Sequence, residues 1–178
     1  MNREVLDMAV SVAVLSLAFS KFFPDPLSSV FAVTAVFAFH ELAHRSVARF
    51  YGCFAEYRRW DFGLLLAAVT AAVPSPFVFA APGAVVISAP FGRRLGKKQF
   101  GVIALSGPLS NIAVGAGFLA LFSLFPSGFF LHAAGVSFFL AFFNLIPVRP
   151  LDGGAVFSWS RAVWAAVTGI SFLGYLLI

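Results

Sequence analysis

Long apolar segments, separated by short polar or proline-rich breaks, make up most of this chain. A helix needs about 20 apolar residues to cross a bilayer, and five segments are interpreted as crossing helices. These are residues 5–19, 27–50, 100–125, 129–146 and 155–178. The tight turn Pro126-Ser127-Gly128 predicts that the third and fourth of these helices are antiparallel neighbours. The first segment could instead be a secretory signal, but Glu4 and Asp7 spoil the positive leading region that a signal needs.

The residues between the second and third crossing helices have a different pattern. Residues 64–73 are apolar but too short to cross a membrane comfortably. Residues 77–89 are rich in Val, Phe and Ile and contain Pro82-Gly83, a pattern that favours extended or hairpin structure over helix. We therefore expect a re-entrant or β-hairpin element within residues 51–99, inside one domain that covers residues 1–178 and has its core at 27–155.

Charge decides between a re-entrant and a crossing course for residues 64–73. If this segment does not cross, eleven of the twelve Lys and Arg residues fall on one side and only Lys21 lies opposite. The eleven are Arg3, Arg45, Arg49, Arg58, Arg59, Arg93, Arg94, Lys97, Lys98, Arg149 and Arg161. Loops rich in Lys and Arg stay in the cytoplasm, so the N-terminus is expected there. The predicted fold is an all-α polytopic membrane protein with five transmembrane helices, and six as the upper limit set by length.

Composition agrees with a protein that lies in lipid. Hydrophobic residues make up 61% of the chain and charged residues 11%, and the mean hydropathy is +0.96, whereas soluble domains carry about 25% charged residues. The formal charge of +5 does not indicate nucleic acid, because no basic run is interleaved with exposed aromatic residues. The single cysteine, Cys53, excludes an internal disulfide and a multi-cysteine zinc site.

One short motif in the second apolar segment carries metal chemistry. His40-Glu41-Leu42-Ala43-His44 is an HExxH pattern, in which the helical repeat brings the two imidazoles to one face and places Glu41 beside them. A buried histidine pair satisfied by hydrogen bonds would be the structural alternative. Ionisable residues within a crossing helix are costly, however, and usually mark a functional site. We therefore expect one Zn²⁺ per chain.

A catalytic zinc usually has three protein ligands and an open position for water. The candidates for the third ligand are His132, Glu56, Asp61 and Asp152. His132 lies near the other end of its helix, and Glu56 and Asp61 have Arg58 and Arg59 as ion-pair partners. Asp152 precedes Gly153-Gly154 in a broken stretch of backbone at the end of the fourth segment, which favours it. Its alternative role is to cap the last helix.

Three motifs together resemble the site-2 protease family of intramembrane zinc metalloproteases. They are HExxH at residues 40–44, the G-P-x-x-N segment at 107–111, and the N-x-x-P-x-x-x-x-D-G pattern at 144–153. The resemblance implies zinc on His40, His44 and Asp152, Glu41 as the catalytic base, and Asn144 and Asn111 near the substrate backbone. It also implies cleavage of transmembrane protein substrates within the lipid bilayer. The PDZ domain that many members contain does not fit into this chain.

Rival functions remain open at this stage. A metal transporter or a metal-binding membrane protein could use the same histidines without breaking a bond, and a zinc hydrolase could act on lipids or small amides. The two asparagines could instead bridge helices. A transporter needs no general base, so Glu41 distinguishes it from a hydrolase. The sequence does not indicate the substrate or the oligomeric state.

Overall fold

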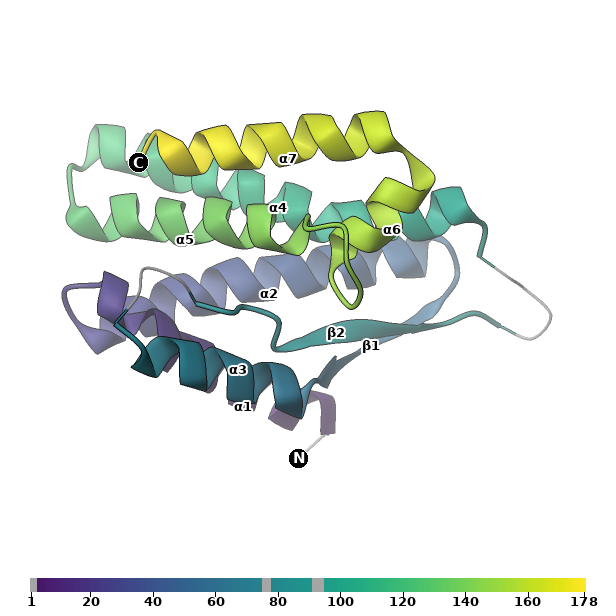
Figure 1. Ribbon diagram of the computed structural model, residues 1–178, viewed down its shortest axis with the longest axis horizontal. Helices are drawn as coiled ribbons and strands as arrows, with labels where there is room; N and C mark the ends of the chain where they lie inside the picture. The colour runs from purple at the N-terminus through teal and green to yellow at the C-terminus, as the bar shows by residue number, and fades with distance from the viewer. Residues whose placement is uncertain (1–2, 75–77, 91–94) are drawn as a thin grey trace.

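The computed structural model describes residues 3–74, 78–90 and 95–178, and most of them are helical (Figure 1). The elements are α1 (Arg3–Phe19), the 3-10 helix η1 (Ser20–Phe22), α2 (Pro26–Phe50), β1 (Phe54–Arg59), α3 (Asp61–Ala72), β2 (Gly83–Ser88), α4 (Lys97–Leu124), α5 (Gly128–Asn144), α6 (Asp152–Trp159) and α7 (Arg161–Leu176). The fold is thus mostly helical with one small sheet, as expected.

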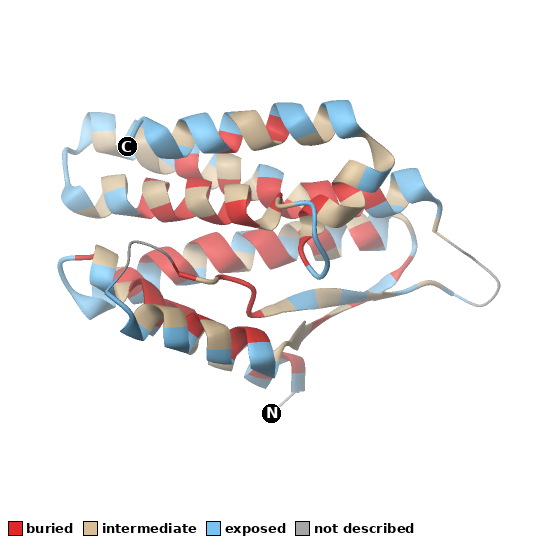
Figure 2. Cartoon of the chain, in the orientation of Figure 1, coloured by how far each residue is buried: buried red, intermediate tan, exposed pale blue. Residues whose placement is uncertain are grey.

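Helix α2 lies at the centre of the molecule. Figure 1 shows α4, α5 and α7 along one side of it, and α1, α3 and the two strands along the other. Helix α2 packs against α4, α1 and α5, while α4 packs against α5 and α6. The antiparallel pairing of α4 with α5 agrees with the turn at 126–128. Buried residues follow α2 and the helix faces turned toward it (Figure 2).

The sequence of α2 explains both its start and its two faces. Asp25 precedes the helix and accepts hydrogen bonds from Ser28 N at 2.8 Å and Ser28 Oγ at 2.6 Å, and Pro26 occupies the first turn. Residues buried at helical spacing form one continuous face: Ser29, Ala32, Val33, Val36, Phe37, His40, Glu41, His44 and Ala48. Large apolar residues such as Phe31 and Phe39 lie exposed on the opposite face. A helix with this exposed surface is suited to lipid.

Within the part of the chain that the structure describes, three helical segments are long and apolar enough to cross a membrane, namely Arg3–Phe22, α2 and α4. Helices α5 and α7 have 17 and 16 residues and are shorter than the usual crossing length. The prediction of a single helix over residues 155–178 is wrong, because the chain breaks at Ser160 between α6 and α7. The Ser160 side chain accepts a hydrogen bond from Val163 N and starts the second helix. Five crossings remain a prediction.

The sheet differs from a local hairpin. Strand β2 pairs antiparallel with β1, with Phe54 opposite Ser88 and Arg59 opposite Gly83, and α3 lies between the strands in sequence. Pro82-Gly83 is therefore not a hairpin turn, and residues 54–59, which include Glu56 and Arg58, form a strand. The expected ion pairs are present, with Arg58 Nη2 at 2.9 Å from Glu56 Oε2 and Arg59 Nε at 2.8 Å from Asp61 Oδ1.

The segment between α2 and α4 leaves and returns at the same end of the molecule. Ile103, in the second turn of α4, contacts His44 near the end of α2, so the two helices are antiparallel. At the far end, Lys21 Nζ donates to Thr70 O near the end of α3 at 3.4 Å. Residues 78–81 then lead back to β2 along a largely buried path. A re-entrant course of residues 64–73 in a bilayer stays a prediction, and Arg93 and Arg94 lie outside the described residues.

Helix α1 is an integral part of the fold. Leu15, Ala18 and Phe19 belong to its buried core. Near its start, Glu4 Oε1 accepts hydrogen bonds from Arg45 Nη1 and Tyr57 N, both at 3.0 Å. These contacts give Glu4 a structural role in joining α1 to α2 and β1.

Candidate metal centre

The buried face of α2 carries His40 and His44 one helical turn apart. Both imidazoles are buried, and their rings lie 4.6 Å apart at an interplanar angle of 83°. The edge-to-face arrangement lets both Nε2 atoms point to the same side, and these atoms lie 3.0 Å apart. The spacing in the HExxH motif therefore produces the paired donors that it predicts.

Asp152 reaches the histidines from the first turn of α6. The loop after α5 folds back through a hydrogen bond from Leu151 N to Val148 O at 3.0 Å. Gly153 permits the close approach, because a Cβ there would lie 2.1 Å from Leu145 O and 2.4 Å from Ile146 O. Because Gly153 has no side chain, the first turn of α6 can pack directly against the backbone that follows α5. Asp152 is the first residue of α6 and makes no side-chain cap, so the capping alternative is not what the structure contains.

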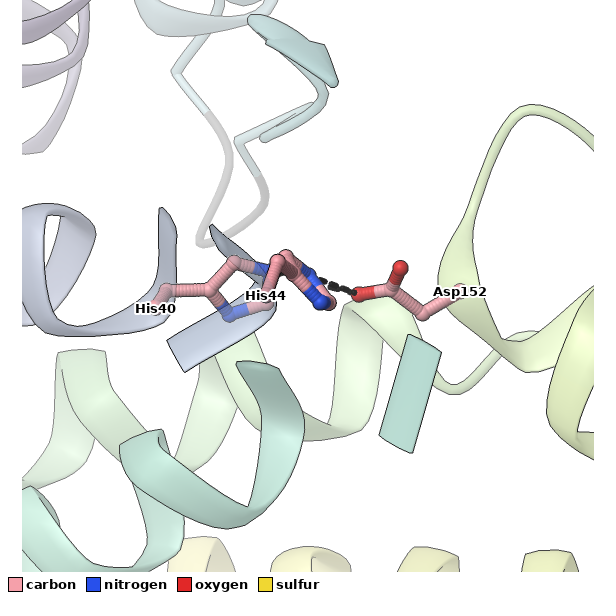
Figure 3. Close-up of side chains that lie close together, drawn as sticks. All are labelled: His40, His44 and Asp152. Atoms are coloured by element: carbon pink, nitrogen blue, oxygen red, sulfur yellow. Dashed lines mark hydrogen bonds and ion pairs between the residues drawn. The ribbon is translucent and has the colours of Figure 1, made fainter. Parts of the chain in front are cut away.

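The three side chains form a nearly equilateral triangle of ligand atoms (Figure 3). Asp152 Oδ2 lies 3.2 Å from His40 Nε2 and 3.2 Å from His44 Nε2, and the third edge is the 3.0 Å between the two nitrogens. Ligand atoms about 2.0–2.1 Å from a tetrahedral zinc lie about 3.3 Å from one another. The triangle therefore fits one zinc ion with little adjustment. Two imidazoles and one carboxylate are also a common ligand set for catalytic zinc.

Asp152 is suited to remain an anion. Burial alone would raise the pKa of its carboxyl group, but the neighbouring His44 and His40 outweigh burial and hold that pKa below its ordinary value. A carboxylate must be deprotonated to bind a metal. The helix dipole at the start of α6 also favours the negative charge.

A backbone carbonyl orients His44 from behind. His44 Nδ1 lies 2.8 Å from Ile103 O, which can only accept a hydrogen bond. The proton therefore resides on Nδ1 and leaves Nε2 free to bind a metal. The sequence does not indicate this role of Ile103, because the contribution comes from the main-chain carbonyl, while its side chain is a buried core residue like many others.

Gly107 lies directly against the metal-binding atoms. A Cβ at this position would lie 2.3 Å from His44 Nε2 and 2.6 Å from His40 Nε2. Any other residue would thus fill the space in which the two nitrogens meet. This explains the glycine of the G-P-x-x-N segment, which the sequence indicated only through the resemblance.

Asn111, at the other end of that segment, lies beside His40. Its Nδ2 is 3.1 Å from His40 Nδ1, and the residue is only 1% exposed. Asn144 is half-buried and donates from Nδ2 to Leu140 O in its own helix at 3.0 Å. Both asparagines line the cavity described next. Their expected place near a substrate backbone stays a prediction.

A cavity of about 150 Å³ opens at the three ligand residues. Glu41 lines it and is buried, and its Oε2 has no hydrogen-bond partner among the described residues. Four residues of β2, namely Gly83, Ala84, Val85 and Ile87, form part of its wall. The loop before α6 lies toward the same strand (Figure 1) and contributes Pro150 and Leu151. The cavity thus brings together a possible metal site, a carboxylate and a strand.

The other candidate ligands lie elsewhere. His132 is exposed, its ring lies 5.9 Å from that of Phe23, and its Nδ1 contacts Gly128 O in its own helix. Glu56 and Asp61 are held in the ion pairs with Arg58 and Arg59. Within the described ranges 3–74, 78–90 and 95–178, the group of His40, His44 and Asp152 is therefore the one that could hold a metal.

Comparison with known proteins supports a metalloprotease. The chain is 38% identical over 186 aligned positions to a protein of Methanocaldococcus jannaschii described as "Putative zinc metalloprotease MJ0611". The alignment covers 99% of this chain and 94% of the relative. The chain belongs to the family of this zinc metalloprotease homologue. No protein-family model and no solved structure was found to match.

Membership of this family and the geometry agree on the metal. The relative's name specifies zinc, and the ligand triangle has the size and the donor atoms that zinc prefers.

Proposed function

We propose that this chain is an intramembrane zinc metalloprotease of the site-2 type, which hydrolyses peptide bonds in or beside the transmembrane helices of other membrane proteins. The observation that carries the proposal is the position of the ligand triangle. Two of its corners lie on α2, a 25-residue helix long and apolar enough to cross a membrane. A protease that acted on soluble proteins would have no need to keep its metal site on such a helix.

Zinc, held by His40, His44 and Asp152, supplies a Lewis acid that lowers the pKa of water and polarises a carbonyl group. Glu41 is the base in this proposal. Its carboxylate lines the cavity and has an oxygen without a protein partner among the described residues, so it can take a proton from water and later give it to the leaving amine. No other described carboxylate except Asp152 lines this cavity.

Asn144 is proposed to hold the substrate backbone. One N–H of its amide is used within α5, at Leu140 O, which leaves a second N–H and the carbonyl oxygen for a ligand in the cavity. A neutral donor of this kind can stabilise negative charge that develops on a carbonyl oxygen in a site of low dielectric constant.

Strand β2 is proposed to bind an unwound stretch of substrate. A transmembrane helix uses its own peptide groups for internal hydrogen bonds, so it must open before a peptide bond can reach the ligands. Among the described residues β2 pairs with β1 alone, so its other edge has no strand partner there. Residues of β2 also form part of the cavity wall. An extended peptide could add to this edge as a third strand and so present its backbone to the metal.

The proposed route for water is short. His44 lies six residues before the end of α2 at Phe50, about 9 Å along the helix axis at 1.5 Å per residue. The same end of α2 carries Arg45 and Arg49, which we assign to the cytoplasmic side. Water would therefore enter from the cytoplasm.

Zinc content and cleavage measured on the same samples would test the proposal. The parent chain, Glu41→Gln and the control Glu56→Gln would be purified in detergent and mixed with a model transmembrane substrate. Glu56 is a surface carboxylate in β1 paired with Arg58 and lies outside the cavity. We expect about one zinc per chain in all three proteins, and cleavage by the parent and the control only.

The pattern of results separates the rival functions. Zinc without cleavage by the parent, together with transport of zinc in vesicles, would replace the protease by a metal transporter. A modified lipid instead of a shortened peptide would change the substrate class. Absence of zinc from the parent would overturn the proposed mechanism.

A further inference from the structure

The G-P-x-x-N motif implies that Asn111 lies near the substrate backbone. The side chain of Asn111 instead contacts His40. It lies behind His40, away from the atoms that face Asp152. Its Nδ2 is 3.1 Å from His40 Nδ1, and its Oδ1 is buried with no hydrogen-bond partner among the described residues. An amide placed to bind substrate would have its free groups accessible, yet this residue is only 1% exposed.

The chemistry of the two histidines shows what His40 requires. A neutral imidazole that binds a metal through Nε2 carries its proton on Nδ1, and that N–H needs an acceptor. His44 has one in Ile103 O at 2.8 Å. For His40, the group within hydrogen-bonding distance of Nδ1 among the described residues is the side-chain amide of Asn111. An acceptor is therefore needed at the position where Nδ2 now lies.

A rotation of the Asn111 amide by 180° exchanges its oxygen and nitrogen. In the observed orientation Nδ2 donates to a bare Nδ1, which places the His40 proton on Nε2, the atom that faces His44 and Asp152. In the rotated orientation Oδ1 accepts from Nδ1–H, and Nε2 is free for a metal. Either orientation leaves one atom of the amide without a partner, so the contact with His40 is what distinguishes them.

We infer that Asn111 is a positioning residue, which selects the metal-binding tautomer of His40 by accepting a hydrogen bond from its Nδ1. The inference rests on the proposed zinc site and deepens it. Asn111 would act through His40 and touch neither the zinc nor the substrate. The backbone of Asn111 has a separate role, since its carbonyl accepts from Ser137 Oγ at 2.7 Å and joins α4 to α5. A change of the side chain leaves that bond in place.

Two variants of similar size separate the acceptor from the packing. Asn111→Leu fills the space but cannot accept a hydrogen bond, whereas Asn111→Asp can only accept. Zinc affinity, measured by competition with a chelator in detergent, should fall about 10–100-fold in Asn111→Leu. We expect Asn111→Asp to bind zinc at least as tightly as the parent. Ser110→Ala is the control, because Ser110 bonds only to Gly107 O within its own helix and should leave the affinity unchanged.

Each outcome decides a specific point. Equal affinity in Asn111→Leu and the parent would overturn the inference while leaving the zinc site intact. A loss in Asn111→Asp as large as that in Asn111→Leu would overturn it as well, since an acceptor would not rescue binding. Melting curves of the metal-free proteins would show whether Asn111→Leu folds, and the Asp variant decides the matter if it does not. A parent that binds no zinc would overturn the proposed function together with this inference.

Discussion

The third ligand is the residue on which the proposed zinc site depends most. Asp152 Oδ2 completes the triangle with edges of 3.2 Å to both histidines, and it supplies the only negative charge among the three ligands. Asp152→Asn keeps the size of the side chain but removes that charge. We expect zinc affinity to fall more than about 100-fold, beyond the loss typical of a residue behind a ligand. Chelator competition measures it, with Asp61→Asn as the control, and unchanged affinity would remove Asp152 from the site.

Gly107 offers a prediction with an unusual combination of effects. An added Cβ would lie 2.3 Å from His44 Nε2, so Gly107→Ala should displace the imidazoles and abolish zinc binding. Alanine nevertheless favours a helix over glycine by about 1 kcal/mol, which offsets part of the cost of displacing the buried imidazoles, so the metal-free protein should still fold and melt cooperatively. The matched control is Gly117→Ala in the same helix, where a Cβ would meet nothing within 4 Å. Normal zinc content in Gly107→Ala would contradict this account.

The residues differ in how far the sequence could reveal them. His40, Glu41 and His44 were predicted because a helical repeat places them on one face whatever surrounds that helix. Asp152 depended on an argument about broken backbone, and its 108-residue separation from His44 could be closed only by the fold. Ile103 acts through a main-chain carbonyl and leaves no trace in the sequence.

At the scale of elements, the strands were the hardest part to predict. In β1, Ala55 and Tyr57 are buried while Phe54 is exposed. The sequence hides this strand, because three charged residues within 56–59 are more typical of a loop. The pairing partner of β1 lies beyond α3, so no local turn indicates the sheet. Strand β2 was expected as extended structure from its β-branched residues alone. The break at Ser160 was missed because no proline or glycine marks it, although Ser158, Ser160 and Arg161 interrupt the apolar pattern there.

The free edge of β2 leads to a prediction about exchange. If substrate adds to this edge, backbone amides of residues 83–88 should exchange more slowly with deuterium when Glu41→Gln is saturated with a substrate that it cannot cleave. Amides of α7, on the opposite side of α2 (Figure 1), serve as the internal control. Equal exchange in β2 with and without substrate would argue that the substrate binds elsewhere in the cavity.

The start of α2 gives the fold a pH dependence. Hydrogen bonds from the side chain and the backbone N–H of Ser28 lower the pKa of Asp25 below its ordinary value. The stabilisation is therefore present above the unfolded-state pKa of about 4 and is lost as the pH falls through the lower folded-state value. Asp25→Ala should melt below the parent at pH 7, and the difference should shrink in acid.

Serine at the same position gives the control for that prediction. Asp25→Ser retains a cap that does not titrate, so its melting temperature should lack this part of the acid dependence. A difference between Asp25→Ala and the parent that stayed constant down to pH 2 would show that the carboxylate charge contributes nothing to the cap.

Over the whole molecule, charge is separated along the long axis. The right-hand side of Figure 1 holds the end of α2 and the starts of α4 and α7, and the start of α1 lies nearer the middle, at the lower edge. These ends carry Arg3, Arg45, Arg49, Lys97, Lys98 and Arg161, while Lys21 lies at the opposite end in η1. These cations therefore lie away from Lys21 along the molecule, and their common placement on one side of a membrane stays a prediction.

This distribution predicts the orientation of the protein in a cell membrane. Positively charged ends remain in the cytoplasm, so the metal site should open there and the turn between α4 and α5 should face outward. Single cysteines would be placed in a Cys53→Ala background at Ser127, in that turn, and at Lys98, at the start of α4. Both positions are exposed. A maleimide that cannot cross membranes should label Ser127→Cys in intact cells and Lys98→Cys only after permeabilisation.

The reverse labelling pattern would place the metal site toward the outside and contradict the assignment of the cations. Labelling of both cysteines in intact cells would mean that α4 does not cross, although it has 28 residues, about 42 Å at 1.5 Å per residue. Because α4 supplies Gly107 and Asn111 to the site, that result would also remove the metal centre from the bilayer. The labelling experiment therefore tests the intramembrane part of the proposed function independently of whether the enzyme cleaves any chosen substrate.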